Sequence, residues 1–201
     1  MRVVVPFGAR DPNSRLAPFL SLDERRDFAA AMCRDVIDAL DGHEPELLVD
    51  TAVGFDPGVP VTVDDRPLGG AVDAQLESGV PVAVVMADLP LVTPAVVDRL
   101  LAPETDLVFA PGRGGGTNAM VVRHPGFRTD YHGASICDHR AIARERGASV
   151  TEVDSFRLAT DVDERADLAE VLLHGDGAAA DWLVDAGVEL RVRDGRVGVE
   201  R

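Results

Sequence analysis

PVAVVMADLPLVT, residues Pro81–Thr93, is the stretch of sequence that decides the fold. It opens with an unbroken apolar run, Val82–Ala87, which is short and rich in valine. Such a run is typical of a strand buried on both faces, as in parallel sheets. Asp88 ends the run, and Thr93-Pro94 then starts a helix with a hydroxyl cap and a proline in its first turn. This order predicts one unit of a parallel α/β sheet.

Asp88 is the first candidate functional residue. Its carboxylate stands at the carboxyl end of a central strand, which is where open α/β sheets bind their ligands. We therefore expect Asp88 to hold a divalent metal against a nucleotide. A turn or capping aspartate is the alternative that this stretch alone leaves open.

Strands alternate with helices along the whole chain, at a spacing that predicts a mostly parallel sheet with helices on both faces. Ser21 and Glu24 form a capping box for a helix that runs to about Leu40, before Gly42. Asp194-Gly195 predicts a hairpin of Val188–Arg193 and Arg196–Val199. The other expected strands are 3–5, 47–51, 61–63, 106–111 and 149–153, and the other helices are 70–78, 94–101, 135–147, 164–173 and 178–185.

The fold class that follows is α/β, with three layers (α/β/α), a mostly parallel central sheet and a small C-terminal hairpin. At 201 residues, one domain over 1–201 is the simplest expectation, with a core of about 1–173 and a peripheral helix and hairpin at about 174–201. Cys33 and Cys137 lie far apart in expected helices, so we expect isolated thiols.

The charge of the chain limits its partners. The formal net charge is -15, and all 20 basic residues are arginine. This balance argues against nucleic acid and against anionic membranes, because both need basic patches. It favours a halophilic protein hydrated in high salt, although an ordinary acidic cytosolic protein is also possible. With no stretch of roughly 20 apolar residues and no signal-peptide pattern, we expect a cytoplasmic location.

Two loops carry candidate binding residues. Arg15 lies in the polar loop after the first strand, near the expected carboxyl edge, where it could meet a triphosphate or be a surface arginine. Further on, Gly114-Gly115-Gly116 lets backbone amides face inward as an anion-binding nest, and Thr117 adds a hydroxyl donor. A flexible hairpin between the flanking strands is the alternative for the glycine run.

Two further segments offer anion or metal ligands. Ser135 is expected to cap a helix, with Asp138 three positions on, and it could serve only that helix or also attract an anion. His139, inside this helix, is expected to be structural or on the surface. Asp161 and Asp163 are spaced to ligate Mg²⁺ beside the sheet edge, although Asp163 could simply be the N-cap of the next helix.

These signals occur together in one order, and the order resembles a known family. The pattern is similar to the 2-phospho-L-lactate guanylyltransferase family of deazaflavin coenzyme F(420) biosynthesis, which belongs to the nucleotidyltransferases similar to molybdenum-cofactor guanylyltransferase. The resemblance covers about residues 1–173. Its motifs are Pro6-Phe7, Ser14–Ala17, Glu24-Arg25, Ala87–Leu91, Gly115–Ala119, Ser135 with His139, and Asp161–Asp163 leading into Asp167-Leu168.

The resemblance implies a nucleotidyltransferase fold, usually as a homodimer. It implies an enzyme that joins 2-phospho-L-lactate to GMP from GTP, releasing pyrophosphate and giving lactyl-diphospho-guanosine. Mg²⁺ would lie on Asp88, Asp161 and Asp163, and the catalytic residues would be Asp88 and Arg15. The nucleotide would contact Pro6, Phe7, Ser14 and Arg15, and the acceptor would contact Thr117, Asn118, Gly133 and Ser135.

The chain departs from the family pattern at three positions. Gly8 and Asn13 stand in the first loop, where the family often has lysines, and His132 stands where it often has glycine. These differences bear on nucleotide grip and on the preferred acceptor.

Several alternatives remain at the level of sequence. The same chemistry could act on phosphoenolpyruvate or 3-phosphoglycerate. A molybdenum-cofactor-type or sugar-phosphate nucleotidyltransferase usually opens with a Leu-x-Gly-Gly loop, whereas this chain has Pro6–Ala9. A non-catalytic nucleotide-binding protein would have no reason to keep three aspartates and Thr117.

Overall fold

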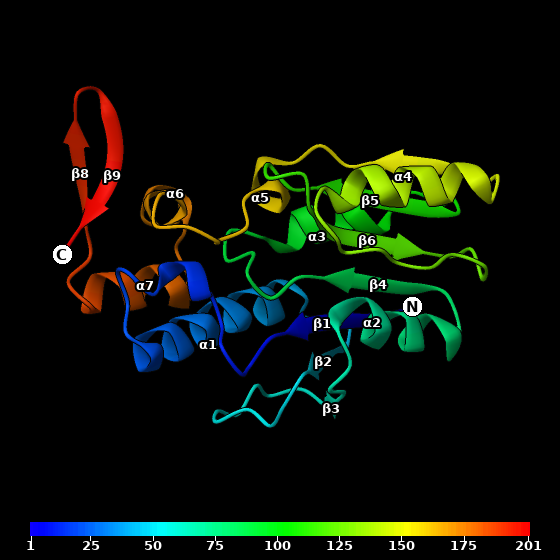
Figure 1. Cartoon of the computed structure of the whole chain (residues 1–201), viewed down its shortest axis with the longest axis horizontal. Coiled ribbons are helices and arrows are strands. Elements are labelled where there is room, and N and C mark those ends of the chain that lie inside the picture. Colours follow the sequence, from blue (N-terminus) through cyan, green and yellow to red (C-terminus); the bar gives the residue numbers. More distant parts are fainter.

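The computed structural model describes residues 1–201 and contains a central seven-stranded sheet in the order β3-β2-β1-β4-β6-β5-β7 (Figure 1). Four of its six strand pairings are parallel, and only β6 runs antiparallel to its neighbours β4 and β5. The mostly parallel sheet expected from the sequence is therefore confirmed. The strands are β1 (Arg2–Phe7), β2 (Pro45–Val49), β3 (Val61–Val63), β4 (Val82–Val85), β5 (Leu107–Pro111), β6 (Thr117–Val122) and β7 (Val150–Glu152).

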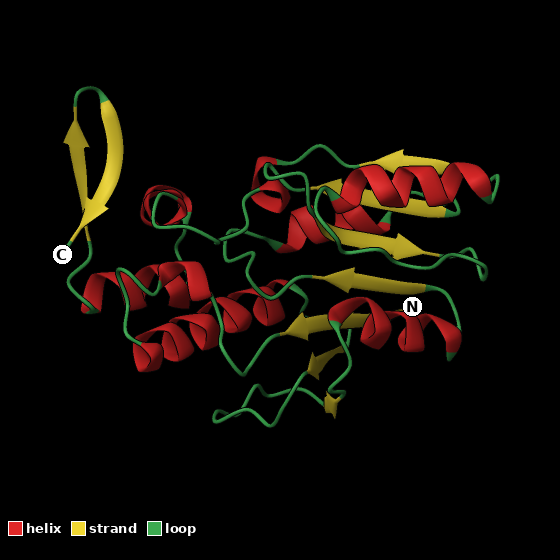
Figure 2. Ribbon diagram, in the orientation of Figure 1, coloured by secondary structure: helices red, strands yellow, loops and turns green.

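Alternation along the strands divides the core into two halves. In β4, Ala83 and Val85 belong to one buried cluster, and Val82 and Val84 belong to the other, because successive side chains point to opposite faces. Helices cover both faces, as the three-layer expectation requires (Figure 2). The larger cluster includes residues of α1 (Leu22–Ala39), α3 (Pro94–Leu101), α5 (Phe156–Ala159), α6 (Asp167–His174) and α7 (Ala178–Asp185), and the smaller includes residues of α2 (Leu68–Glu77) and α4 (Ser135–Glu145).

Local sequence signals place several element ends correctly. The Ser21 hydroxyl accepts a hydrogen bond from the Glu24 amide, and the Glu24 carboxylate accepts one from the Ser21 amide, so the capping box of α1 is confirmed. The hairpin of β8 (Glu189–Arg193) and β9 (Arg196–Glu200) turns at Asp194-Gly195, whose φ angles are 51° and 74°. Figure 1 shows this hairpin projecting away from the sheet.

The helix caps suggested by three polar residues are confirmed only in part. Thr93 is the N-cap of α3, as expected, but its hydroxyl makes no cap hydrogen bond. Ser135 is not the N-cap of α4, because it is the first residue of the helix and its hydroxyl contacts Thr117 of β6. The alternative of Asp163 as an N-cap is wrong, because α6 begins only at Asp167. The short helix α5, which lies before Asp163, has no counterpart among the helices predicted from sequence.

Both cysteines are free, as expected, with Cys33 buried and Cys137 exposed. None of the helices combines the length and the apolar character that crossing a membrane requires. The assignment of 1–201 to a single domain stays a prediction.

Candidate active site

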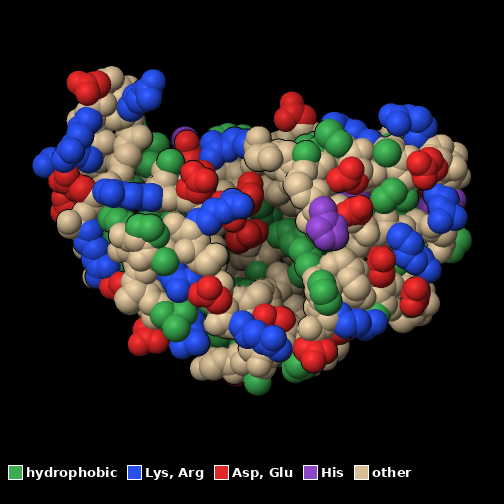
Figure 3. Space-filling view, in the orientation of Figure 1, with side chains coloured by type: hydrophobic (Ala, Val, Ile, Leu, Met, Phe, Trp, Pro, Cys, Tyr) green, Lys and Arg blue, Asp and Glu red, His purple; other side chains and the backbone are tan.

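A cavity of about 690 Å³ opens at the carboxyl ends of β1, β2, β3 and β4, where parallel sheets place their ligand sites. Figure 3 shows a hollow near the middle of one face of the molecule. The first loop, the ends of the four strands and Asp163 line the cavity. Among the expected site residues, the lining includes Pro6, Phe7, Ser14, Arg15, Asp88 and Asp163.

Asp88 meets the second aspartate segment directly. The amide of Val162 donates a hydrogen bond of 3.0 Å to the Asp88 carbonyl, so Asp161 and Asp163 flank the point of contact. The Asp88 Oδ1 atom is buried and has no hydrogen-bond partner. Burial first, and then repulsion by Asp161 and Asp163, raises the pKa of the Asp88 carboxyl to about 7. Two acidic segments that are far apart in sequence thus meet beside the cavity, and Asp88 and Asp163 line it.

The first loop closes against the same segment. Arg15 Nη1 lies 2.7 Å from Asp163 Oδ2, and the side-chain amide of Asn13 donates through Nδ2 to the Val162 carbonyl at 2.8 Å. Burial and the neighbouring Asp161 raise the pKa of the Asp163 carboxyl, while Arg15 opposes the rise. Arg15 therefore lines the cavity and at the same time pairs with the aspartate segment.

The donor set of this cluster suits a hard divalent cation. No group of three or more acidic, histidine or cysteine side chains is already gathered as a metal cage. However, an unpartnered buried carboxylate oxygen next to two further carboxylates is an arrangement that a cation would stabilise. Mg²⁺ characteristically takes only one or two carboxylates and keeps other positions for water or phosphate. The residues present therefore fit this metal.

The glycine loop between β5 and β6 is closed by two backbone hydrogen bonds. The Gly112 amide donates to the Gly116 carbonyl, and the Gly115 amide donates to the Gly112 carbonyl. A Cβ atom on Gly112 would lie 2.3 Å from Asn118 Oδ1, and this close approach explains the glycine there. The loop joins the antiparallel strands β5 and β6 as a hairpin, and an anion-binding nest at Gly114–Gly116 stays a prediction.

Asn118 reaches toward the aspartates. Its Nδ2 donates to the Leu158 carbonyl at 2.9 Å and to Asp161 Oδ1 at 3.0 Å. Asn118 is buried, so its amide orients the Asp161 carboxylate from inside the protein. This contact ties the glycine loop to the aspartate segment.

Thr117 and Ser135, both of which the resemblance assigns to the acceptor, lie next to each other. Ser135 Oγ donates to Thr117 Oγ1 at 3.3 Å, and the Ile136 amide donates to the Gly115 carbonyl. The start of α4 is thereby fixed to the glycine loop. Gly133, with φ of 53°, lies in the exposed turn before α4, whereas Thr117 and Ser135 are buried.

Comparison with known proteins decides the family. The family model described as "Guanylyl transferase CofC like" matches residues 1–199. This chain belongs to that family. The 2-phospho-L-lactate guanylyltransferase of Halomicrobium mukohataei is 64% identical over 204 residues and covers 100% of both chains. The protein of the same name from Haloarcula marismortui is 62% identical, covering 100% of this chain and 99% of its own.

Solved structures show the same fold at low sequence identity. A nucleotide-diphospho-sugar transferase structure from Desulfovibrio desulfuricans G20 aligns with a TM-score of 0.73 at 15% identity, covering 92% of this chain and 94% of its own. The 2-C-methyl-D-erythritol 4-phosphate cytidylyltransferase of Thermus thermophilus aligns with a TM-score of 0.55 at 15% identity, covering 85% and 97%. The expected nucleotidyltransferase fold is therefore confirmed.

The structure also brings in residues to which the sequence interpretation gave no role. Asn13, which stands where the family often has a lysine, joins the first loop to the aspartate segment. Arg25 is buried and donates to Asp11 and to the Pro12 carbonyl, which anchors the first loop on α1. His139 is buried and contacts Thr117. No local pattern signals these contacts.

Proposed function

We propose that the chain is a 2-phospho-L-lactate guanylyltransferase, which joins 2-phospho-L-lactate to GMP from GTP with release of pyrophosphate. Membership of the guanylyl transferase family and two full-length relatives of that name support this function. The observation in the structure that carries it is the meeting of Asp88, the Asp161–Asp163 segment and Arg15 at the end of a nucleotide-sized cavity. The product would be lactyl-diphospho-guanosine, an intermediate for coenzyme F(420).

GTP would occupy the cavity, held by the first loop. Pro6 and Phe7 line the cavity at the end of β1. Ser14 and Arg15 line it from the first loop, where Arg15 contacts Asp163. The Arg15 guanidinium would exchange part of its contact with Asp163 for oxygens of the β- and γ-phosphates. This exchange would bring the α-phosphorus toward Asp88, which lines the same cavity.

Asp88, Asp161 and Asp163 would hold Mg²⁺ at this position. When bound, the ion would supply positive charge that offsets the repulsion between two polyanionic substrates. Asn118 would hold the Asp161 carboxylate in place from behind. The buried Oδ1 of Asp88 would gain the partner that it lacks in this structure.

The acceptor would bind beside Thr117 and Ser135. The exposed turn that includes Gly133 is the side from which it would reach these two hydroxyls. Its phosphate oxygen, already ionised at neutral pH, would attack the α-phosphorus of GTP. The bond from the α-phosphorus to the bridging oxygen would break, and pyrophosphate would leave. No general base is required, so the residues act by orienting groups and balancing charge.

A pyrophosphate-release assay in molar KCl with Mg²⁺ and GTP, with and without 2-phospho-L-lactate, tests this function. We expect release that requires both the metal and the acceptor. Phosphoenolpyruvate and 3-phosphoglycerate, compared in parallel, would reveal a different acceptor. No release with any of the three from folded protein would contradict the proposed function.

Three properties of the working enzyme are also proposals. The charge of -15 supports activity in high salt, where counterions screen the repulsion between acidic side chains. A homodimer and a cytoplasmic location stay predictions, and gel filtration in molar KCl would test the first of them.

A further inference from the structure

His139 is a buried histidine whose two ring nitrogens both make hydrogen bonds. The Asp130 amide lies 3.0 Å from Nε2, and Thr117 Oγ1 lies 2.8 Å from Nδ1. A backbone amide can only donate, so Nε2 must carry the lone pair. In a neutral imidazole the proton then resides on Nδ1, which therefore donates to Thr117. The contacts fix one tautomer.

The surroundings of His139 keep the ring neutral and in place. The rings of Phe109, Phe127 and Tyr131 surround it, with centroids 5.2 to 5.9 Å away. Burial lowers the pKa of His139 to about 4.

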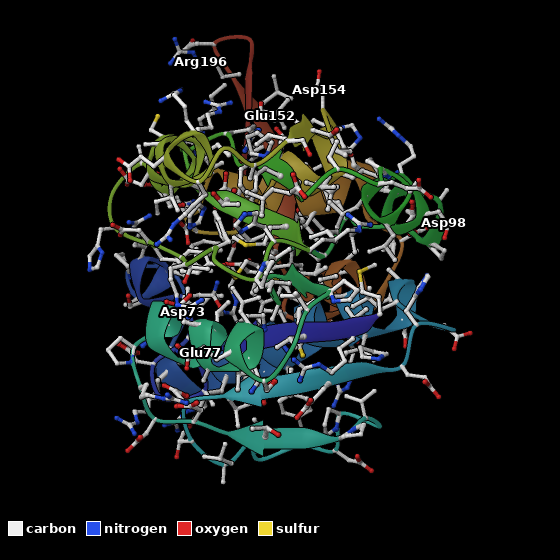
Figure 4. All side chains as sticks on the ribbon, turned by 90° about the vertical axis from the view of Figure 1, so that its right-hand side faces the viewer. Asp73, Glu77, Asp98, Glu152, Asp154 and Arg196 are labelled. Atoms are coloured by element: carbon white, nitrogen blue, oxygen red, sulfur yellow. The ribbon has the colours of Figure 1, made fainter.

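The segment that supplies the Asp130 amide is itself anchored on α2. Asp73 accepts hydrogen bonds from the amide and the hydroxyl of Thr129, and Glu77 pairs with Arg128. Figure 4 labels Asp73 and Glu77 along this helix. The direction in which the His139 ring faces is thus set by contacts on both sides.

The consequence falls on the Thr117 hydroxyl. A hydroxyl oxygen accepts two hydrogen bonds and donates one. Thr117 Oγ1 already receives a hydrogen from His139 Nδ1, so it cannot donate to His139. Ser135 Oγ, 3.3 Å away, can turn its hydroxyl to donate to Thr117 as well. The proton of Thr117 is then available to a third group.

We propose that His139 is a positioning residue that fixes the Thr117 hydroxyl as a hydrogen-bond donor to anionic oxygens of the acceptor. The proposal rests on the acceptor role proposed for Thr117. It distinguishes His139 from a histidine that only fills space between aromatic rings, because it assigns the ring's Nδ1–H a task at the site.

The tautomer can be measured first, in the wild-type chain. Nitrogen-15 NMR of the imidazole in molar KCl should show a protonated Nδ1 and an unprotonated Nε2 at neutral pH. A protonated Nε2 would overturn the proposal, whatever reaction the enzyme performs. This measurement needs neither a variant nor activity.

Two substitutions then separate the roles of the two nitrogens. In His139→Asn an amide N–H can occupy the position of Nδ1, whereas His139→Gln can keep only the Nε2 side. Losing one hydrogen bond to a correctly placed donor should raise the acceptor KM about tenfold in His139→Gln. The GTP KM should not change, and His139→Asn should stay within about twofold of wild type.

A cycle with Thr117→Val excludes a purely structural effect. Without the hydroxyl, His139→Gln should no longer change the acceptor KM; an equally large change in that background would overturn the proposal. If the wild-type protein releases no pyrophosphate, the proposed function fails. Calorimetric Kd values for 2-phospho-L-lactate then replace KM in the same cycle, and absence of coupling between the two positions would overturn the role of His139.

Discussion

The proposed nucleotide side and the proposed acceptor side of the site are held together by different physical means. On the nucleotide side, Arg15 and Asp163 pair while 66% and 48% of their side chains are exposed. On the acceptor side, Thr117, Ser135 and His139 are neutral and at most 3% exposed. Salt screens exposed charges but hardly affects buried neutral hydrogen bonds. We therefore expect ionic strength to affect the contacts of the first half and to have little effect on the hydrogen bonds of the second.

Asp88→Asn should have the largest effect, since Asp88, whose Oδ1 is buried and unpartnered, belongs to the proposed metal site. It removes a charge that the proposed metal needs, and we expect kcat to fall by roughly a thousandfold. The fold should persist, because an amide at this buried position lacks the repulsion that raises the pKa of the carboxyl. Pyrophosphate release and circular dichroism measure the two outcomes.

Asp98→Asn provides the matched control for that substitution. Asp98 lies on α3, and 73% of its side chain is exposed (Figure 4). The same loss of one negative charge should leave turnover unchanged there. Near-normal turnover in Asp88→Asn would show that Asp88 is not a metal ligand.

Thr117→Ala should act on the acceptor side alone. The substitution removes a buried hydroxyl that we assign to an anionic acceptor, and a hydrogen bond to a charged group contributes enough to raise the acceptor KM about thirtyfold. The KM for GTP should stay the same. Steady-state kinetics with each substrate varied in turn would show this, and an unchanged acceptor KM would refute the role assigned to Thr117.

Arg15→Gln should act on the nucleotide side, and its effect should depend on salt. We expect the GTP KM to rise about tenfold at low salt, because one charge-assisted contact to the triphosphate is lost. In molar KCl the rise should shrink, as screening weakens the lost interaction.

Arg26→Gln is the control for Arg15→Gln. Arg26 is also exposed and also lies near an aspartate, Asp23, at 3.6 Å. It should leave the GTP KM unchanged at every salt concentration. A salt-independent effect of Arg15→Gln would show that the nucleotide side is not governed by charge.

Sequence reasoning succeeded where the signal is local or repeats along an element. The capping box of Ser21 and Glu24 and the turn at Asp194-Gly195 each depend on residues within a few positions. The apolar run before Asp88 predicts a buried central strand, because burial on both faces leaves no polar position. These patterns suffice for the layers and for the edge of the sheet that holds the cavity.

The same reasoning failed where a side chain finds a distant partner. Ser135 has the residue type of a cap, but Thr117 of β6 lies next to it and takes its hydroxyl. Asn13 bonds to Val162 across 149 positions, and His139 bonds to Thr117 across 22. Propensity describes what a residue does with its neighbours in the chain, and only the folded sheet creates these other neighbours.

The last expected effect concerns stability instead of turnover, and it is a pH dependence that arises at His139. The pKa of His139 is about 4 in the folded chain, against an ordinary value of 6.5, because burial outweighs the attraction of Asp130, Asp138 and Asp73. Between these values the unfolded chain binds more protons. The contribution of a neutral His139 is therefore present above about pH 6.5 and is lost as the pH falls toward 4. The full loss corresponds to about 3 kcal/mol of unfolding free energy.

Urea unfolding of wild type and His139→Asn in molar KCl would isolate the contribution of His139 to the free energy of unfolding. The carboxyl of Asp88, whose pKa is raised, works in the opposite direction, since its stabilising effect is lost as the pH rises. Asp88 is common to both proteins, so it cancels in their difference. That difference should shrink by about 3 kcal/mol from neutral pH to pH 4. Parallel pH curves would mean that folding does not lower the pKa of His139, which would contradict a ring held neutral by burial.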